Sequence, residues 1–584
     1  MIAGSAPVVT LPHRASIASF KNVLNKKASG DRVPVATIPW LAWAVALGVV
    51  LVWFGTLDFR HLLRSDEGRY AEIAREMWVS GDWVTPRYNA LKYFEKPPLH
   101  LWATAISYHL FGVGEFQARL WVALNGAAGL ILTALAARRW WGPRVGALAG
   151  LVLLAAPNWN LGGHFNSLDM SVSAALAAVL AGALIAQHPQ ADGPARLRWM
   201  LFAWGAMGVA VLTKGLIGIV LPGLALVVYS LWARDALIWR RLHIVPGVLL
   251  LLAITVPWFW LVSARNPEFL QFFFVHEHFE RYTTTVHERG APFWYFAPQL
   301  LAGFLPWVGL GAGMARLAMA PAAGPGLRPG LLLAAWALSI FAFFSVSNSK
   351  LPGYILPVMP ALAILAALAL DRMTPKQWSR QLLGALIVAV LLLVASPFAA
   401  RLSTDNTPNA LYRAFAPWLI AATATVVAGV LLAGWLHRRQ QRWASVWAYG
   451  VTMFIGTTIG LAGHETIGRA VSGVDLVPAI EAVLKPDMAI YGVRVLDHTL
   501  PFYLRHPLVM VEAPDELAFG VQQEPAKWLP TMAAFRERWR SGPPALAVMA
   551  QDTFQKLQAE GLPMVPVAED TRRVVVANFP RNAQ

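Results

Sequence analysis

The sequence of 584 residues contains no cysteine, and only 14% of its residues are charged. Without cysteine the protein can form neither disulfide bonds nor thiolate metal sites, and its redox compartment cannot be inferred. The low charge content, together with 57% hydrophobic residues and 26 tryptophans, excludes an ordinary soluble protein. Acidic residues are also scarce, 32 against 48 basic ones. Because the basic residues lie in short clusters between apolar runs, we attribute them to membrane topology and expect no nucleic-acid partner.

Apolar runs long enough to cross about 30 Å of hydrocarbon recur along most of the chain. They predict a polytopic α-helical membrane protein with about thirteen transmembrane helices. The predicted spans lie near residues 38–56, 116–137, 144–160, 169–187, 197–213, 215–233, 244–263, 293–316, 330–346, 352–371, 381–399, 413–436 and 443–463. A further run at residues 98–112 is short, and counting it would move every later arginine cluster to the outer side. We therefore place that run in the membrane interface.

The distribution of charge also predicts the orientation of the chain. The first apolar run follows a polar, basic stretch and lacks a small-residue cleavage site, so we predict an uncleaved span and a cytoplasmic N-terminus. An odd number of spans then places the C-terminal residues on the outer side. The same topology puts the unusual polar segments at span ends on that side as well. These segments are residues 57–115, 166–169, 214, 264–292 and 348–354.

The long apolar runs end and a different residue pattern begins after about residue 468. This change predicts two parts, a membrane domain over residues 1–467 and a soluble domain over residues 468–584. In the second part, short β-rich runs alternate with helical patterns, as expected of a small α/β domain. The β-rich runs lie at residues 488–496, 508–513, 545–550 and 574–579, and the helical patterns at 531–540 and 552–561. No glycine-rich phosphate-binding motif is present, so we expect a lid or an acceptor-binding cap rather than a nucleotide domain.

The densest cluster of charge runs from Arg64 to His100 and reads RSDEGRYAEIAREMWVSGDWVTPRYNALKYFEKPPLH. Its first half predicts an amphipathic helix whose apolar stripe lies in lipid at the membrane surface. The stripe consists of Tyr70, Ile73, Met77 and Trp78. This loop places acidic and basic side chains beside a bilayer, which is typical of an active site for a charged, lipid-linked substrate.

Two aspartates are candidate catalytic residues. Asp66 heads the amphipathic helix, where it can act as a helix cap or as a carboxylate facing a cavity above the membrane. In the second case it can stabilise positive charge on a sugar ring or deprotonate an acceptor hydroxyl. Glu67 follows directly, but neighbouring residues of a helix point in different directions, so we expect only one of the two to act. Asp169 opens an apolar span and has the same two interpretations.

Several cations and tyrosines near the outer ends of spans are candidates for binding the substrate. A single cation there is usually explained by its side chain reaching the interface, but four on one side favour a phosphate ligand. They are Lys96, Lys214, Arg281 and Lys350. The tyrosines can stack on a sugar or merely anchor the protein at the interface. They are Tyr70, Tyr93, Tyr282 and Tyr354.

A histidine-rich triplet is the candidate metal site. His276 and His278 flank Glu277, and alternate residues of an extended segment face the same way, so this pair can ligate a divalent cation together with Glu95. A solvated loop without metal is the alternative. We otherwise expect that no cofactor is required.

The first outer loop, DEGRYAEIAREMWVSGDWVTPRYNALKYFEKPPL, resembles that of the bacterial aminoarabinose transferases, which are protein O-mannosyltransferase-like, polyprenyl-phosphate-dependent glycosyltransferases. The later motifs HFNSLD, LTKG, HEHFERYTT, PFWYF and SNSKLPGYILP resemble that family in order. The resemblance implies a GT-C membrane fold with a periplasmic C-terminal domain in the bacterial inner membrane. It also implies transfer of 4-amino-4-deoxy-L-arabinose from undecaprenyl phosphate to lipid A phosphates. We expect the protein to be a monomer that contacts membrane lipids.

The same resemblance implies roles for particular residues. Asp66 and Asp169 match the acidic positions of the family, and Lys96 and Arg281 match positions expected to hold the carrier phosphate. Whether Asp66 is a base or an electrostatic group depends on the acceptor, because a phosphate is already ionised near neutral pH whereas a hydroxyl is not. The alternatives are transfer of another sugar to a protein or glycan, and a lipid transporter. A transporter, however, usually has its charges near the bilayer midplane.

Overall fold

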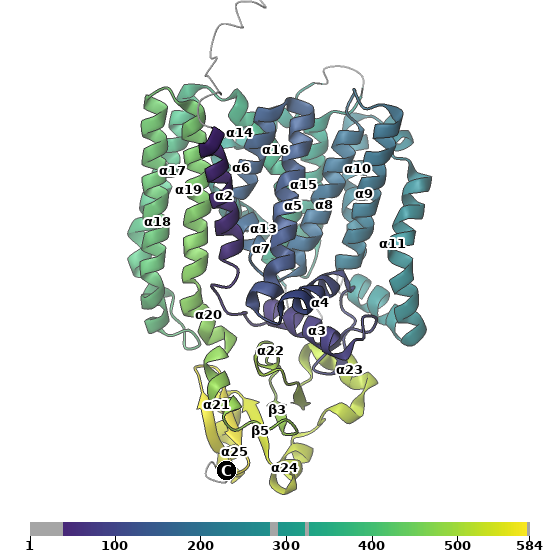
Figure 1. The fold of residues 1–584 in the computed structure, drawn as a ribbon, viewed down its shortest axis with the longest axis vertical. Coiled ribbons are helices and arrows are strands. Elements are labelled where there is room, and N and C mark those ends of the chain that lie inside the picture. Colours follow the sequence, from purple (N-terminus) through teal and green to yellow (C-terminus); the bar gives the residue numbers. More distant parts are fainter. Residues whose placement is uncertain (1–38, 281–289, 322–325, 581–584) are drawn as a thin grey trace, which may run out of the picture. The chain divides into compact units, whose positions relative to one another are not determined.

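The computed structural model describes residues 39–280, 290–321 and 326–580, and it divides into two compact units, Met1–Val52 and Trp53–Gln584. The described residues of the first unit belong to helix α2 (Pro39–Gly55), which ends in the second unit. All other helices and strands belong to the second unit (Figure 1).

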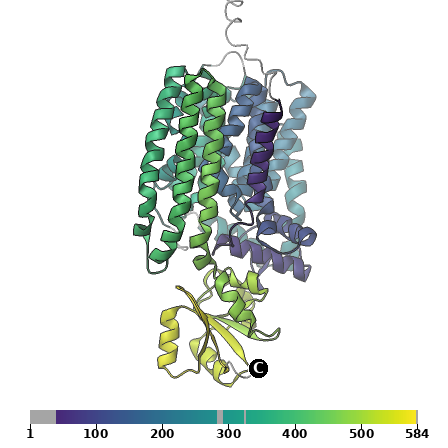
Figure 2. The ribbon, with the colours of Figure 1, turned by 60° about the vertical axis from the view of Figure 1, so that its left-hand side comes forward.

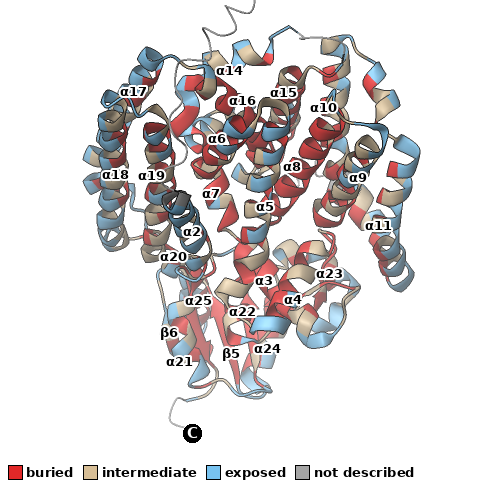
Figure 3. Cartoon of the chain, turned by 45° about the horizontal axis from the view of Figure 1, so that its top comes forward, coloured by how far each residue is buried: buried red, intermediate tan, exposed pale blue. Residues whose placement is uncertain are grey.

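Among the described residues, nine helices are long and apolar enough to cross a membrane. They are α5 (Glu115–Trp141), α8 (Leu168–Ala186), α9 (Gly193–Lys214), α11 (Ile244–Arg265), α15 (Pro329–Val346), η4 (Pro352–Val358) with α16 (Met359–Arg372), α17 (Pro375–Ala395) with η5 (Ser396–Leu402), α18 (Asn409–Arg438), and α19 (Arg442–Gly463) with α20 (Glu465–Ser472). Figure 3 shows that α8 is buried among its neighbours whereas α17 and α18 have exposed faces.

Two sharply bent pairs and two shorter apolar helices account for the other predicted spans. The pair α6 (Pro143–Leu154) and α7 (Pro157–Gly163) is bent by 70°, and the pair α13 (Phe296–Gly303) and η3 (Leu305–Leu310) with α14 (Gly311–Ala318) is bent by 89°. The shorter helices are α10 (Ile217–Ala233) and the Trp43–Gly55 part of α2. Every predicted span therefore falls on a helix or a bent pair, while the number that crosses the membrane stays a prediction.

A segment of short elements follows α2. It consists of α3 (Asp66–Ser80), β1 (Arg87–Tyr88), β2 (Leu91–Lys92) and α4 (Leu99–Phe111). Figure 1 shows α3 and α4 lying across the end of the helix bundle. Helix α3 ends at Gly81, whose φ of 69° is the left-handed conformation that favours glycine. Helix α4 has only 13 residues, too few to cross a bilayer, which agrees with its assignment as a non-spanning segment.

The apolar stripe of α3 does not face lipid, so that prediction is wrong. Tyr70, Ile73 and Met77 are buried in a core that also contains Leu496 and Met510 of the C-terminal region. Trp78 packs in a neighbouring core that contains Phe502. The other sides of α3 are buried too: Glu72 and Arg75 form an ion pair of 2.6 Å, and burial raises the pKa of Glu76 to about 8. Helix α3 is therefore covered by protein except at its end, where Val79 and Ser80 are exposed.

The C-terminal region forms a five-stranded sheet in the order β4-β3-β5-β7-β6. The strands are β3 (Ala489–Val493), β4 (Leu508–Val511), β5 (Ala545–Met549), β6 (Val565–Glu569) and β7 (Val574–Ala577). β3 is parallel to β4 and β5, whereas β7 is antiparallel to β5 and β6. In Figure 2, α19 leads through α20 into this sheet (green to yellow). Four strands lie in the predicted β-rich runs; β6 was not predicted, because Pro566 and an irregular register interrupt its pattern.

Helices cover both faces of this sheet. On one face α24 (Met532–Ser541) and α25 (Gln551–Ala559) contribute Phe535, Trp539 and Phe554 to the core, and both helices lie in predicted helical patterns. On the other face, α21 (Val477–Glu481) and α22 (Leu500–Leu504) contribute Ile480 and Leu500. The remaining short helices are η1 (Leu237–Arg241), η2 (Gln271–Glu280), η6 (Val474–Leu476), η7 (Asp515–Leu517), α23 (Ala518–Gln523) and η8 (Pro525–Lys527).

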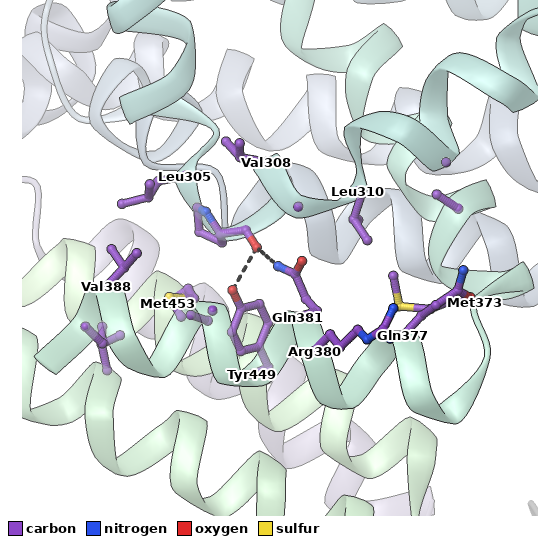
Figure 4. Close-up of a pocket in the computed structure, with 18 of the residues that line it drawn as sticks. Leu305, Val308, Leu310, Met373, Gln377, Arg380, Gln381, Val388, Tyr449 and Met453 are labelled. Carbon is purple, nitrogen blue, oxygen red and sulfur yellow. Dashed lines mark hydrogen bonds between the residues drawn. The ribbon is translucent and has the colours of Figure 1, made fainter.

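A cavity of about 990 Å³ lies beside the break between α13 and α14. The carbonyl oxygen of Pro306 at this break accepts hydrogen bonds from the Tyr449 hydroxyl (2.7 Å) and the Gln381 amide (2.8 Å), as Figure 4 shows. The wall is largely apolar, with Arg372 and Arg380 among its few charged residues. None of the candidate site residues lines this cavity, so the candidate site lies elsewhere.

Candidate active site

The first turn of α3 holds two neighbouring carboxylates in different surroundings. The side chain of Asp66 is 22% exposed, whereas that of Glu67 is fully buried. Glu67 Oε1 lies 2.7 Å from Nε of Arg119, and its Oε2 lies 3.6 Å from Nη1 of Arg60. The backbone N–H of Asn166 also donates to Glu67 over 3.0 Å. Adjacent helical positions point in different directions, so only Asp66 remains accessible.

The charge state of Glu67 follows from these contacts. Burial alone would raise its pKa, but the positive charges of Arg119 and Arg60 outweigh burial and lower the pKa to about 2. Glu67 is therefore ionised at neutral pH and joins α3 to α5. This role is structural, which leaves Asp66 as the candidate for chemistry.

Asp66 belongs to a short chain of charges that sequence reasoning missed. Arg69, one helical turn later, forms ion pairs with both Asp66 and Glu516. It also lies 3.4 Å from the Tyr93 hydroxyl and over the Tyr70 ring at 5.1 Å from its centroid. The spacing between Asp66 and Arg69 was a usable signal, because residues three apart on a helix are neighbours. No spacing pattern identified the other partner, Glu516, which lies 447 positions after Arg69 in the sequence.

The two tyrosines of this region are buried. Tyr70 packs edge-on against His100, with ring centroids 5.7 Å apart, and Tyr93 packs edge-on against Tyr88 at 6.0 Å. Burial raises the pKa of Tyr70; Arg69 opposes this effect, and the carboxylates of Asp66 and Glu95 add to it. The Asp66 and Glu95 carboxylates are therefore both close enough to the Tyr70 phenol for their charges to affect it. Sugar stacking by either tyrosine stays a prediction.

A second cluster unites three of the predicted motifs. Asp169, in the first turn of α8, forms an ion pair with Lys214 at the end of α9. The Lys214 ammonium lies 4.5 Å from the centre of the Tyr354 ring. Gly353 packs so closely that a Cβ there would collide with the Asp169 carboxylate. Lys350, three residues before Gly353, is also buried. Its ammonium, however, donates to the carbonyl of Ser347 in its own loop.

Lys96 joins the first loop to the loop after α11. Its ammonium lies 3.0 Å from Glu277, 2.7 Å from the Glu95 carbonyl and 3.8 Å from the Glu95 carboxylate. Sequence reasoning missed Glu277 as a partner of Lys96 because it assigned the HEH triplet to metal. Two of the candidate residues in this loop, Arg281 and Tyr282, lie outside the described residues.

The geometric premise of the metal site is wrong. Residues Gln271–Glu280 form a π-helix rather than an extended segment, so alternate positions do not share a face. The ring of His276 stacks on Phe272, with centroids 5.3 Å apart. Within the described ranges, no group of three or more histidine and carboxylate side chains is arranged to hold a metal. The side chain of His278 lies outside what the structure describes, so a cation at Glu95 and His276 stays a prediction.

Comparison with known proteins decides the family. Residues 476–578 match the aminoarabinose transferase C-terminal domain, and residues 95–260 match the dolichyl-phosphate-mannose-protein mannosyltransferase family. An undecaprenyl phosphate-alpha-4-amino-4-deoxy-L-arabinose arabinosyl transferase of Aeromonas salmonicida is 34% identical over 421 residues, covering 69% of this chain and 73% of the relative. The chain belongs to this arabinosyl transferase family. A family member from Serratia proteamaculans is 32% identical over 443 residues, covering 72% and 76% of the two chains.

Solved structures of the arabinosyl transferase family agree with the fold. The crystal structure of ArnT from Cupriavidus metallidurans bound to undecaprenyl phosphate has a TM-score of 0.90 and 52% identity, covering 94% of this chain and all of that chain. The apo structure of the same protein has a TM-score of 0.88 and 53% identity, covering 92% and 98%. The prediction of a multi-pass GT-C membrane protein with a C-terminal α/β domain is confirmed. As an arabinosyl transferase the chain is a glycosyltransferase, not a transporter.

Proposed function

We propose that this protein transfers 4-amino-4-deoxy-L-arabinose from undecaprenyl phosphate to a phosphate of lipid A. The observation that carries the proposal is the partly exposed Asp66 carboxylate, which Arg69 holds. Lys96, from the same outer loop, supplies a cation that is paired with Glu277. This arrangement suits a reaction that separates a positively charged sugar from an anionic lipid phosphate. Likeness at 52% identity to a transferase bound to undecaprenyl phosphate supports the donor.

In the proposed reaction, the bond between the anomeric carbon and the donor phosphate breaks, and a bond between that carbon and an acceptor phosphate oxygen forms. The sugar ring gains positive charge in the transition state, which the Asp66 carboxylate stabilises. The leaving undecaprenyl phosphate keeps the bonding electrons, and the Lys96 ammonium stabilises its charge. The acceptor phosphate is already ionised near neutral pH, because its second pKa is about 6, so no general base is needed.

The proposal includes a location. The N-terminus is cytoplasmic, the C-terminal domain is periplasmic, and the protein acts as a monomer in the bacterial inner membrane. The C-terminal ends of α16 and α18 lie away from α3, and each carries an arginine in its last turn. Basic residues at the ends of spans are typical of the cytoplasmic side. No cofactor takes part in the proposed chemistry. Full activity of enzyme purified with a chelator is the expected result, and activity restored only by a divalent cation would contradict it.

Mass spectrometry of lipid A tests the proposal as a whole. Cells that lack other aminoarabinose transferases but supply the donor should add a pentosamine to lipid A only when this protein is present. The Asp66→Asn variant at equal expression is the matched control and should leave lipid A unmodified. Unmodified lipid A with the unchanged protein, together with a newly glycosylated protein or glycan, would contradict the proposed acceptor.

A further inference from the structure

A second cavity, of about 430 Å³, lies where the C-terminal sheet meets the residues before α3. Part of its wall follows β3, and another part follows β4, which is parallel to β3. The carboxyl ends of parallel strands meet at one edge of a sheet, the usual position of ligand sites in such sheets. The wall consists of Arg64, Val471, Arg494, Val495, Leu496, Asp497, His498, Ala513, Asp515, Arg572 and Arg573. None of these residues has a role in the proposed transfer chemistry.

Two of the four arginines in this wall are neutralised by the protein itself. Arg573 forms ion pairs with Asp497 (2.6 Å) and Asp570 (3.0 Å), and it also donates to two backbone carbonyls. Arg494 forms an ion pair with Glu512. These pairs build the wall and leave little charge for a ligand.

The other two arginines, Arg64 and Arg572, have no carboxylate partner among the residues that the structure describes. Arg572 donates from Nη2 to the Thr407 hydroxyl over 3.3 Å, but its Nε is buried with no hydrogen-bond partner. A buried donor without a partner is costly, so the Nε of Arg572 favours an added acceptor. Arg64, which lines the same cavity, is exposed. The lining has four arginines against two aspartates, Asp497 and Asp515, and the further carboxylates Glu512 and Asp570 pair with Arg494 and Arg573 rather than with Arg64 or Arg572.

The titration of Arg572 agrees with this count of charges. Burial lowers its pKa, and the charges of Arg64 and Arg573 lower it further, whereas the Asp570 carboxylate opposes these effects. Arg64 and Arg572 are thus close enough for their charges to interact, and neither forms an ion pair with a carboxylate among the described residues.

We infer that this cavity binds a phosphate group of the saccharide lipid that accepts the sugar, with Arg64 and Arg572 as its two ligands. The inference rests on the proposed function and names the acceptor subsite. Arginine presents a planar fork of donors that matches phosphate oxygens in pairs. Arg64 is two positions before Asp66, so their Cα atoms are at most about 7 Å apart. A phosphate held by Arg64 therefore lies beside the carboxylate assigned to the sugar, whereas the donor phosphate is assigned to Lys96.

Steady-state kinetics of the purified full-length enzyme test the inference. The Arg572→Gln and Arg64→Gln variants should each raise the KM for lipid A about tenfold, the effect of one charge-assisted hydrogen bond. The KM for undecaprenyl-phosphate-linked sugar and the kcat should change less than about twofold in Arg572→Gln. Arg572→Lys, which keeps the charge, should recover part of the affinity. Arg538→Gln is the matched control, because Arg538 is exposed on α24 and does not line the cavity.

The possible outcomes separate the inference from the function on which it rests. Unchanged acceptor KM values in both variants, with normal transfer by the unchanged enzyme, would overturn the inference alone. A raised donor KM in Arg572→Gln would overturn it too, since the cavity would then serve the donor. No transfer to lipid A by the unchanged enzyme would overturn the function and the inference together. Inorganic phosphate at the same concentration as lipid A should not compete; equal inhibition would show a site for free phosphate instead.

Discussion

Replacing Glu67 by Gln and, separately, Asp66 by Asn tests whether two adjacent carboxylates have different tasks. Both substitutions keep size and hydrogen-bonding capacity and remove one negative charge. Glu67 is fully buried against Arg119 and Arg60, whereas Asp66 is partly exposed and pairs with Arg69. We therefore expect Glu67→Gln to lower the stability of the fold and Asp66→Asn to lower turnover.

The size of the first effect follows from the titration of Glu67. Its pKa falls from 4.5 to about 2, which at 1.36 kcal/mol per pKa unit corresponds to roughly 3 kcal/mol of native-state stabilisation. Removing one partner of a buried ion pair costs about 3–5 kcal/mol, in agreement. Because the folded pKa is depressed, this stabilisation is present above pH 4.5 and is lost as the pH falls towards 2. Glu67→Gln should lose that acid dependence together with the stability.

Asp66→Asn should leave the fold unchanged, because Asp66 is partly exposed and the buried Arg69 keeps its ion pair with Glu516. Its transfer rate should fall at least about 100-fold if the carboxylate stabilises the transition state. Thermal unfolding in detergent between pH 7 and pH 2 measures the first variant, because the predicted acid dependence lies below pH 4.5. Initial rates with saturating donor measure the second. A Glu67→Gln protein that melts like the unchanged protein would refute the structural role. A fully active Asp66→Asn protein would withdraw Asp66 from the chemistry.

Three other predictions follow from ion pairs and from topology. Lys96→Ala should raise the KM for the donor about ten- to a hundredfold by removing a charge-assisted contact to its phosphate, and an unchanged donor KM would contradict the assignment. Glu516→Gln leaves Arg69 paired with Asp66 alone, so kcat measured at equal expression should fall about tenfold, the effect of one charged hydrogen bond; unchanged kcat would make this contact dispensable. In this cysteine-free chain, cysteine at Glu560 should react with an impermeant thiol reagent in cells with a permeabilised outer membrane, and cysteine at Lys376 should not. The reverse labelling would contradict the predicted orientation of the chain in the membrane.

The parts of the fold that sequence predicted are those with a local cause. A transmembrane helix requires an unbroken apolar run, and strands β3, β4, β5 and β7 consist of short buried apolar runs. Strand β6 lacks that signal, because Pro566 and a change in register interrupt it. For α3, the periodicity showed an apolar face but could not show that a domain more than 400 positions away covers it.

The same limit applies to the candidate site. Asp169 and Lys214 were identified because charges at the ends of apolar spans are conspicuous, and the structure pairs them. The partner of Arg69, by contrast, is a glutamate 447 positions away in the sequence, and no local pattern distinguishes Glu516 from its neighbours. The geometric premise drawn from the HEH triplet failed for a related reason: whether alternate residues share a face depends on the backbone, which here is a π-helix.

The link between Arg69 and Glu516 has a consequence for the synthesis of the protein. The two residues are 447 positions apart, and chains fold from the N-terminal side as they are made. Until the C-terminal sheet has been translated, the apolar face of α3 has nothing to cover it, and Arg69 has only one of its two carboxylates. A chain interrupted before that point cannot complete the site.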